Sequence, residues 1–145
     1  MLQVQNITFS YDKNKVIKNI DFSASKGQNI AIIGESGCGK STLLKLIYGL
    51  LAPDSGEVFF KGEHLNGPHE KLIPGHDSMK MLSQDFNLNL FAKVYENIES
   101  MLSNEDLNAK KQKAKKMMEF LRIDHLATKK IVDLSGGEQQ RVALA

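Results

Sequence analysis

The chain has 145 residues, of which 41% are hydrophobic and 25% charged, and its formal net charge is +2. This length suits one domain with a real core, and the near balance of charges argues against a nucleic-acid-binding protein. Its apolar runs are far shorter than the roughly 18 residues of a membrane span, and the N-terminus lacks the pattern of a signal peptide. A single cysteine, Cys38, indicates a reduced, cytosolic chain.

The first half of the chain shows both strand and helix patterns. Near-alternating apolar residues up to Phe22, interrupted by the polar residues 12–15, predict short antiparallel strands joined by a turn. Residues 29–33 form an apolar run between two glycines and predict a buried central strand. An amphipathic helix that ends near Gly49 and Pro53 is predicted by the spacing of Leu43, Leu46, Ile47 and Leu50.

The second half begins with a turn at residues 54–56 and a strand at 58–60, followed by a polar loop over 63–78 and a possible strand at 79–83. One helix face is predicted on Val94, Ile98, Met101 and Leu102. The next helix has Ser103 and Asp106 as its expected cap, and its apolar side holds Leu107, Ala114, Met117, Met118 and Leu121. We interpret its lysine-rich stretch, 110–116, as a solvent-exposed helix face rather than a surface that binds lipid or nucleic acid.

Residues 34–41 fit the phosphate-loop pattern G-x-x-x-x-G-K-[ST] at every fixed position. Glycines let successive N–H groups point into one concavity, and the helix that follows aims its positive end at the same place. Lys40 can reach the β- and γ-phosphates, and the Ser41 hydroxyl can ligate Mg²⁺. The expected nucleotide-binding residues of this loop are Gly34, Glu35, Ser36, Gly37, Cys38, Gly39, Lys40, Ser41 and Thr42, with Lys40 also a candidate catalytic residue.

Residues 134–141 read Leu-Ser-Gly-Gly-Glu-Gln-Gln-Arg. Ser135 and Glu138 form an S-x-x-E capping box, which predicts the start of a helix. Gly136 and Gly137 leave the first turn open, and such a helix N-terminus suits a γ-phosphate. The expected nucleotide-binding residues of this segment are Ser135, Gly136, Gly137 and Glu138. This octapeptide, downstream of a phosphate loop, resembles the signature motif of ATP-binding cassette (ABC) proteins. The resemblance is to the ATP-binding subunit of an ABC transporter and extends from Met1 to Ala145.

The resemblance assigns roles to three further residues. Tyr11 matches the aromatic that stacks on adenine, although by itself it also fits a strand residue that packs a core edge. Val16 matches the apolar neighbour of the base. Gln84 matches the glutamine that contacts Mg²⁺ and the attacking water, which makes it a candidate catalytic residue beside Lys40. The expected metal contacts are Ser41 and Gln84.

The resemblance implies an α/β fold: a P-loop NTPase core with an N-terminal antiparallel β subdomain and a helical subdomain, incomplete at the C-terminus. We expect the β subdomain and core in residues 1–85, the helical subdomain in 86–134, and the start of the signature helix in 135–145. ABC domains follow this helix with a strand that supplies a Mg²⁺-binding Asp and a catalytic Glu, and later with a histidine. These 145 residues contain none of the three, so we expect a truncated chain that is by itself inactive.

The implied function is the ATP-hydrolysing subunit of an ABC transporter, with ATP and Mg²⁺ as cofactors. Its expected partners are a second ABC domain, in a head-to-tail homodimer or heterodimer, and separate transmembrane subunits, with no nucleic acid. The expected location is the cytoplasmic face of the cell membrane. Two alternatives stay open: a soluble ABC ATPase that acts on DNA or the ribosome, and a nucleotide-binding module without turnover. The residues indicate neither the transported substrate nor its direction.

Overall fold

The computed structural model describes residues 1–145 except 66, 72–73 and 103–105. The chain divides into two compact units, Met1–Met81 and Leu82–Ala145, and each is described by itself. Ser103, one of the two residues of the predicted helix cap, lies outside the described residues.

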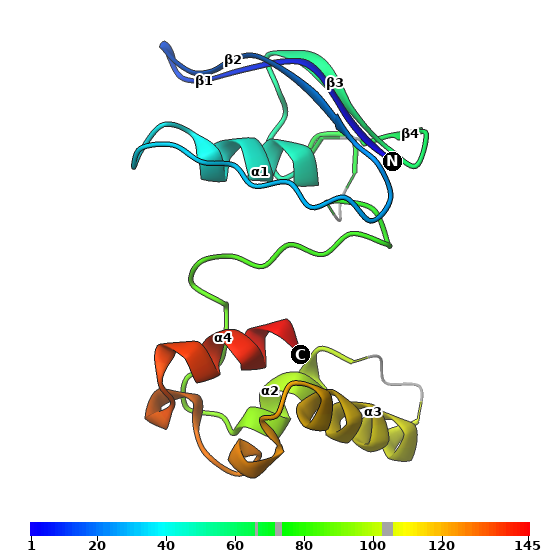
Figure 1. The fold of residues 1–145 in the computed structure, drawn as a ribbon, viewed down its shortest axis with the longest axis vertical. Helices are drawn as coiled ribbons and strands as arrows, with labels where there is room; N and C mark the ends of the chain where they lie inside the picture. The colour runs from blue at the N-terminus through cyan, green and yellow to red at the C-terminus, as the bar shows by residue number, and fades with distance from the viewer. Residues whose placement is uncertain (66, 72–73, 103–105) are drawn as a thin grey trace. The chain divides into compact units, whose positions relative to one another are not determined.

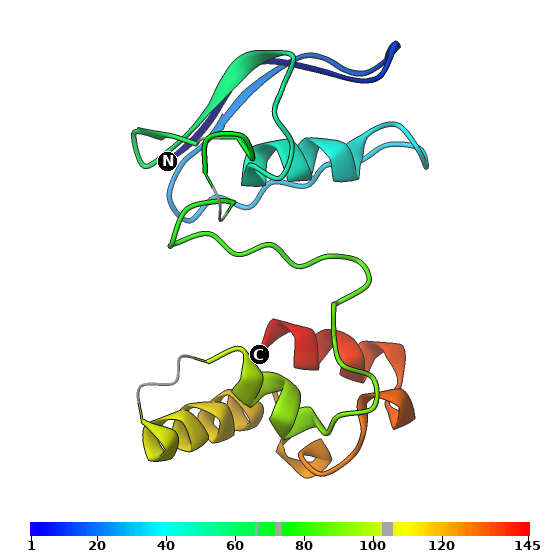
Figure 2. The same ribbon diagram turned by 180° about the vertical axis from the view of Figure 1, so that it is seen from behind.

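The first unit contains a four-stranded antiparallel sheet with one helix along one of its faces (Figures 1 and 2). Its strands are β1 (Leu2–Tyr11), β2 (Asn14–Ala24), β3 (Ser55–Phe60) and β4 (Glu63–His64), in the order β2-β1-β3-β4. Val4 in the middle of the sheet is opposite Phe22 on one side and Val58 on the other. The predicted antiparallel strands and the strand at 58–60 are therefore confirmed.

The helix of this unit is α1 (Lys40–Tyr48), which ends at Gly49, a residue with φ of 80°. Its apolar stripe packs on the sheet, and together they bury Val4, Ile7, Phe9, Ile17, Leu43, Leu46, Ile47 and Val58. The predicted amphipathic helix is thus confirmed, with one exception: Leu50 lies beyond the end of the helix and is 40% exposed.

Two predicted strands are wrong. Residues 29–33 have no regular structure, and Ile30 and Ile33 are 44% and 91% exposed. Residues 79–83 are likewise irregular. A strand exists only through hydrogen bonds to a neighbouring strand, and among the described residues neither segment is part of a sheet. The described residues therefore hold no parallel strand before Gly34, contrary to the prediction of a buried central strand.

The second unit is helical and comprises α2 (Val94–Ser100), α3 (Leu107–Phe120), two short 3₁₀ turns, η1 (Asp124–Leu126) and η2 (Ile131–Asp133), and α4 (Gly136–Leu144). Its core is formed by Val94, Ile98, Ala114, Met118, Ile123, Leu126, Ile131, Leu134 and Val142. An isolated bridge between Lys93 and Lys130 joins the residue before α2 to the residue before η2.

Parts of the predicted helix faces in this unit are wrong. Met101 was expected on the apolar face of α2, but it is the C-cap residue and 76% exposed. Leu107, the first residue of α3, is 71% exposed, and Met117 is 37% exposed. Asp106 alone is described as the cap of α3, and its carboxylate accepts a hydrogen bond from the Asn108 N–H at 2.9 Å. Periodicity identified these helices, but it did not predict where each one ends.

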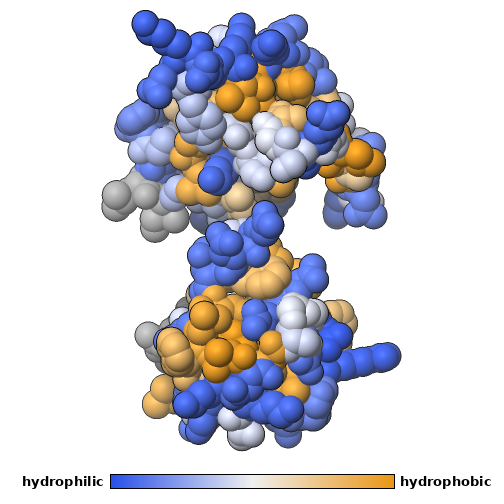
Figure 3. Space-filling model, turned by 90° about the vertical axis from the view of Figure 1, so that its left-hand side faces the viewer, coloured by the Kyte–Doolittle hydropathy of each residue, from blue (hydrophilic) through white to orange (hydrophobic). Residues whose placement is uncertain are grey.

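Apolar side chains reach the surface of both units, as Figure 3 shows in orange. None of the helices in the described part of the chain is long and apolar enough to cross a membrane. The His76 side chain is only 20% exposed, and its Nε2 atom lies 3.5 Å from the Glu63 carboxylate.

Candidate nucleotide-binding site

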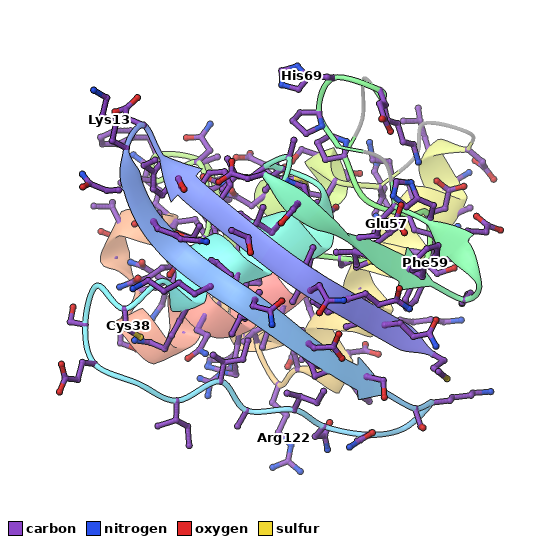
Figure 4. All side chains as sticks on the ribbon, turned by 90° about the horizontal axis from the view of Figure 1, so that it is seen from above. Lys13, Cys38, Glu57, Phe59, His69 and Arg122 are labelled. Atoms are coloured by element: carbon purple, nitrogen blue, oxygen red, sulfur yellow. The ribbon has the colours of Figure 1, made fainter. Side chains whose placement is uncertain are left out.

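The phosphate loop turns back on itself immediately before α1, and Figure 4 labels Cys38 within it. Gly37 and Gly39 have φ of 81° and 99°, a region that disfavours other residues. A Cβ on Gly39 would lie 2.9 Å from Val16 Cγ1 and 3.0 Å from Ile17 Cδ1. The loop therefore packs closely against β2, and Val16, the predicted neighbour of the base, lies beside it.

The Lys40 ammonium lies inside this loop. It donates hydrogen bonds to the carbonyl oxygens of Gly34 at 2.9 Å and Glu35 at 2.6 Å, and the Cys38 sulfur is 3.8 Å away. These contacts hold the cation among the backbone groups of the motif. An anion that enters the loop thus meets a positive charge that is already in place.

The N-terminus of α1 has no side-chain cap and no acidic residue in its first turn. Leu43 makes the first helical hydrogen bond, to the Gly39 carbonyl at 2.8 Å, so the earlier N–H groups have no acceptor within the helix. By contrast, each of the other α-helices has a carboxylate that accepts a backbone N–H at its start. These carboxylates are Glu96 at α2, Asp106 at α3 and Glu138 at α4. This end of α1 is therefore suited to an external anion, such as a phosphate.

The other predicted residues of the loop differ in exposure. Ser41 is exposed, so its hydroxyl is accessible to a metal ion, whereas Thr42 is buried at 9% exposure. Among the described residues, no group of three or more His, Cys, Asp or Glu side chains is placed to hold a metal. The Ser41 hydroxyl is the side-chain oxygen of this loop that could be a Mg²⁺ ligand.

Tyr11 ends β1 and retains 45% exposure. Its ring is perpendicular to that of Phe9, with the centroids 4.8 Å apart. The structure thus shows Tyr11 packing at the edge of the core, which is one of the two roles predicted for it. Adenine stacking on the exposed part of the ring stays a prediction.

Gln84 lies in a turn near the start of the second unit and is exposed. The strand that was expected to precede it is absent, as described above. The hydroxyl of Ser83 next to it is buried and has no hydrogen-bond partner among the described residues. The predicted contacts of Gln84 with Mg²⁺ and water stay predictions.

The signature residues form the predicted capping box at the start of α4. The Glu138 carboxylate accepts hydrogen bonds from the Ser135 N–H at 2.8 Å and from the Ser135 hydroxyl at 2.7 Å. These bonds, led by the one from the Ser135 side chain, lower the pKa of Glu138 below its ordinary value. A Cβ on Gly136 or Gly137 would meet nothing within 4 Å, so the surface of this first turn is open.

Two polar side chains that position these elements were not singled out from the sequence. The Gln139 side chain donates to the carbonyl oxygens of Ile131 and Leu134, both at 3.1 Å. Asn97 is only 7% exposed, and its amide donates to the carbonyls of Asn89 at 3.1 Å and Lys93 at 3.0 Å. Their signal in the sequence is weak, because a polar residue in the first turn of a helix is usually solvated.

The comparisons with known proteins agree with these motifs. Residues 17–145 match the family described as ABC transporter. The chain is 40% identical over 148 residues to the molybdate/tungstate import ATP-binding protein WtpC of Methanocaldococcus jannaschii, with 100% of this chain and 48% of that protein covered. It is 36% identical over 149 residues to the lipoprotein-releasing system ATP-binding protein LolD of Cytophaga hutchinsonii, with 100% of this chain and 68% of that protein covered. The chain thus spans less than half of this WtpC.

Solved structures show the same likeness. The dimeric structure of MJ0796, a bacterial ABC transporter cassette, matches with a TM-score of 0.82 and 28% identity, over 99% of this chain and 67% of that one. A post-hydrolysis state of the same cassette, bound to ADP and Pi, matches with a TM-score of 0.75 and 26% identity over the same shares. The chain therefore belongs to the ABC transporter family, and its fold is that part of an ABC ATPase cassette that contains the phosphate loop and the signature motif.

Proposed function

We propose that this chain is the ATP-binding part of the ATP-binding subunit of an ABC transporter, and that the complete protein binds and hydrolyses Mg-ATP. The observation that carries the proposal is the phosphate loop, where the Lys40 ammonium is held beside the uncapped N-terminus of α1. A cation and a set of free N–H donors at one place match the charge and the acceptor oxygens of a triphosphate.

Each remaining residue of the site has a proposed role on one nucleotide. Tyr11 stacks on the adenine, and Val16 packs beside it. Glycines 34, 37 and 39 let the backbone of the loop surround the phosphates, together with Glu35, Ser36 and Cys38. Ser41 and Gln84 contact Mg²⁺, which neutralises charge between the phosphates, and Thr42 donates its backbone N–H.

Hydrolysis in a complete site requires a general base for the attacking water. Gln84 can orient a water molecule but cannot remove its proton, because an amide has no basic site at neutral pH. We therefore propose that these 145 residues alone bind ATP without hydrolysing it efficiently.

The signature serves the nucleotide of a second ABC domain, in a head-to-tail dimer. Ser135, Gly136 and Gly137 present a hydroxyl and an open helix N-terminus, and Glu138 sets the geometry of that turn. The matching MJ0796 structure is described as dimeric. The proposed organisation has the β subdomain and core in residues 1–85, the helical subdomain in 86–134 and the signature helix from 135.

Separate transmembrane subunits are the proposed second partner, which would place the protein on the cytoplasmic face of the membrane. An apolar groove of about 390 Å³ on the second unit supports this proposal. The residues that line it are Tyr95, Glu99, Lys111, Ala114, Lys115, Met118, Asp124 and Ala127. The names of the relatives include both an import and a releasing system, so the substrate and the direction are left unassigned.

One variant separates this proposal from its alternatives. Ser135→Arg in the full-length protein places a large cation where the partner's γ-phosphate would bind, so ATP turnover should be lost while ATP binding is retained. A steady-state phosphate-release assay and calorimetric titration measure the two properties. A nucleotide-binding module without turnover would show no wild-type activity to lose, and full activity in Ser135→Arg would contradict the proposed dimer.

A further inference from the structure

The two helix N-termini that the proposed function assigns to phosphate differ in how they are capped. The first turn of α1 has no side-chain cap, whereas at α4 the carboxylate of Glu138 accepts hydrogen bonds from the N-cap residue Ser135. One Oε2 atom of Glu138 accepts both the Ser135 N–H, at 2.8 Å, and the Ser135 hydroxyl, at 2.7 Å. Both donors of Ser135 are thus satisfied within the chain.

This contact has a direct chemical consequence. The Ser135 hydroxyl has one hydrogen, and that hydrogen points at Glu138. It cannot also be donated to a phosphate oxygen. A phosphate that approached Ser135 would in addition place its charge beside a carboxylate, and like charges at such a distance repel.

We propose that Glu138 acts as an internal competitor of the partner's γ-phosphate at the signature, so that ATP-driven dimerisation requires Ser135 to exchange its carboxylate acceptor for a phosphate. The inference rests on the proposed head-to-tail dimer. It makes Glu138 a residue that sets the nucleotide threshold for dimerisation, in addition to capping α4. The same hydrogen bonds from Ser135 lower the pKa of this carboxyl below its ordinary value.

A glutamine at the same position would behave differently. Its amide oxygen can still accept the Ser135 N–H, so the capping box is kept. Its side chain is neutral, and its N–H₂ group can donate to a phosphate. Glu138→Gln therefore removes the competing charge and leaves the helix cap in place.

The chain offers a matched control. At the start of α2, the Glu96 carboxylate accepts the Lys93 N–H at 2.8 Å, the same capping contact in a helix without signature residues. Glu96→Gln therefore repeats the chemical change away from the proposed dimer site. The test compares the wild type, Glu138→Gln and Glu96→Gln as full-length proteins in sedimentation velocity, titrated with the slowly hydrolysed analogue adenylyl imidodiphosphate and Mg²⁺.

The expected result is half-maximal dimerisation of Glu138→Gln at about tenfold lower analogue concentration than for the wild type and Glu96→Gln. An equal or higher concentration for Glu138→Gln would overturn the inference while leaving the dimer intact. If the wild type binds the analogue but never dimerises, the proposed function itself fails, and the inference fails with it. A measurement on the wild type makes the test independent of the variant: the ¹³C carboxyl resonance of Glu138 should shift on dimerisation, and an unchanged resonance would contradict the proposal.

Discussion

At the scale of single residues, the phosphate loop and the signature motif differ in the charge of one key side chain. In the phosphate loop the Lys40 ammonium is held by the carbonyls of Gly34 and Glu35, so the charge complementary to a phosphate is supplied before any ligand binds. At the signature the Glu138 carboxylate accepts both donors of Ser135, so a negative charge already lies beside the Ser135 hydroxyl. One motif is therefore prepared for an anion, and the other needs a rearrangement.

The Glu138 contact predicts a defined pH dependence of stability. Because the pKa of Glu138 is lowered in the folded protein, its contribution to the free energy of unfolding is fully present above the pKa of an unfolded glutamate. That contribution is lost as the pH falls through the folded value. Glu138→Gln cannot titrate, so the difference in stability between wild type and variant should be constant at neutral pH and shrink in acid. Urea denaturation across this range measures it, and a difference that grows in acid would contradict the assignment.

A second residue-scale prediction concerns Gln139. Its side chain joins the carbonyls of Ile131 and Leu134, so Gln139→Ala leaves two acceptors without this partner and should destabilise the protein by about 1–2 kcal/mol. The neighbouring Gln140 is exposed, and Gln140→Ala should change stability by less than about 0.5 kcal/mol. Urea denaturation of both variants gives the comparison, and equal effects would show that the two hydrogen bonds of the Gln139 side chain do not stabilise the protein.

At the scale of elements, prediction succeeded where an element is stabilised by its own residues. The stripe of Leu43, Leu46 and Ile47 identified α1, and the Ser135–Glu138 capping box identified the start of α4. It failed for residues 29–33, because a strand depends on neighbours that the local pattern does not reveal. The sequence also did not predict that α2 ends at Ser100, because no glycine or proline marks the end of this helix.

The packing of α1 on the sheet gives a prediction at this scale. Leu46 is 2% exposed in the core that joins the helix to β1 and β3. Leu46→Ala should therefore lower the free energy of unfolding by about 2–5 kcal/mol, through lost apolar burial and the cavity left behind. Leu44 on the same helix is 48% exposed, and Leu44→Ala should cost far less. Chemical denaturation of the pair tests whether this helix face carries the packing energy, and similar losses would show that it does not.

At the scale of the whole molecule, the family could be predicted from two short motifs about 100 residues apart, and the family match confirms it. The roles of individual residues are harder to predict from the sequence. Gln84 and Tyr11 were assigned by resemblance, and the structure leaves both assignments as predictions. Val16 is a clearer case, because its contact with Gly39 makes it part of the loop's surroundings. Composition and periodicity could not have revealed that contact, which joins residues distant in the chain.

The central claim is that the loop around Lys40 binds the triphosphate of Mg-ATP. Isothermal titration of the full-length protein with Mg-ATP tests it most directly, with Lys40→Ala as the variant and Lys45→Ala, in the last turn of the same helix, as the control. The account predicts that Lys40→Ala weakens binding by about 2–4 kcal/mol while Lys45→Ala binds like the wild type. Equal affinity of Lys40→Ala and wild type for Mg-ATP would contradict it.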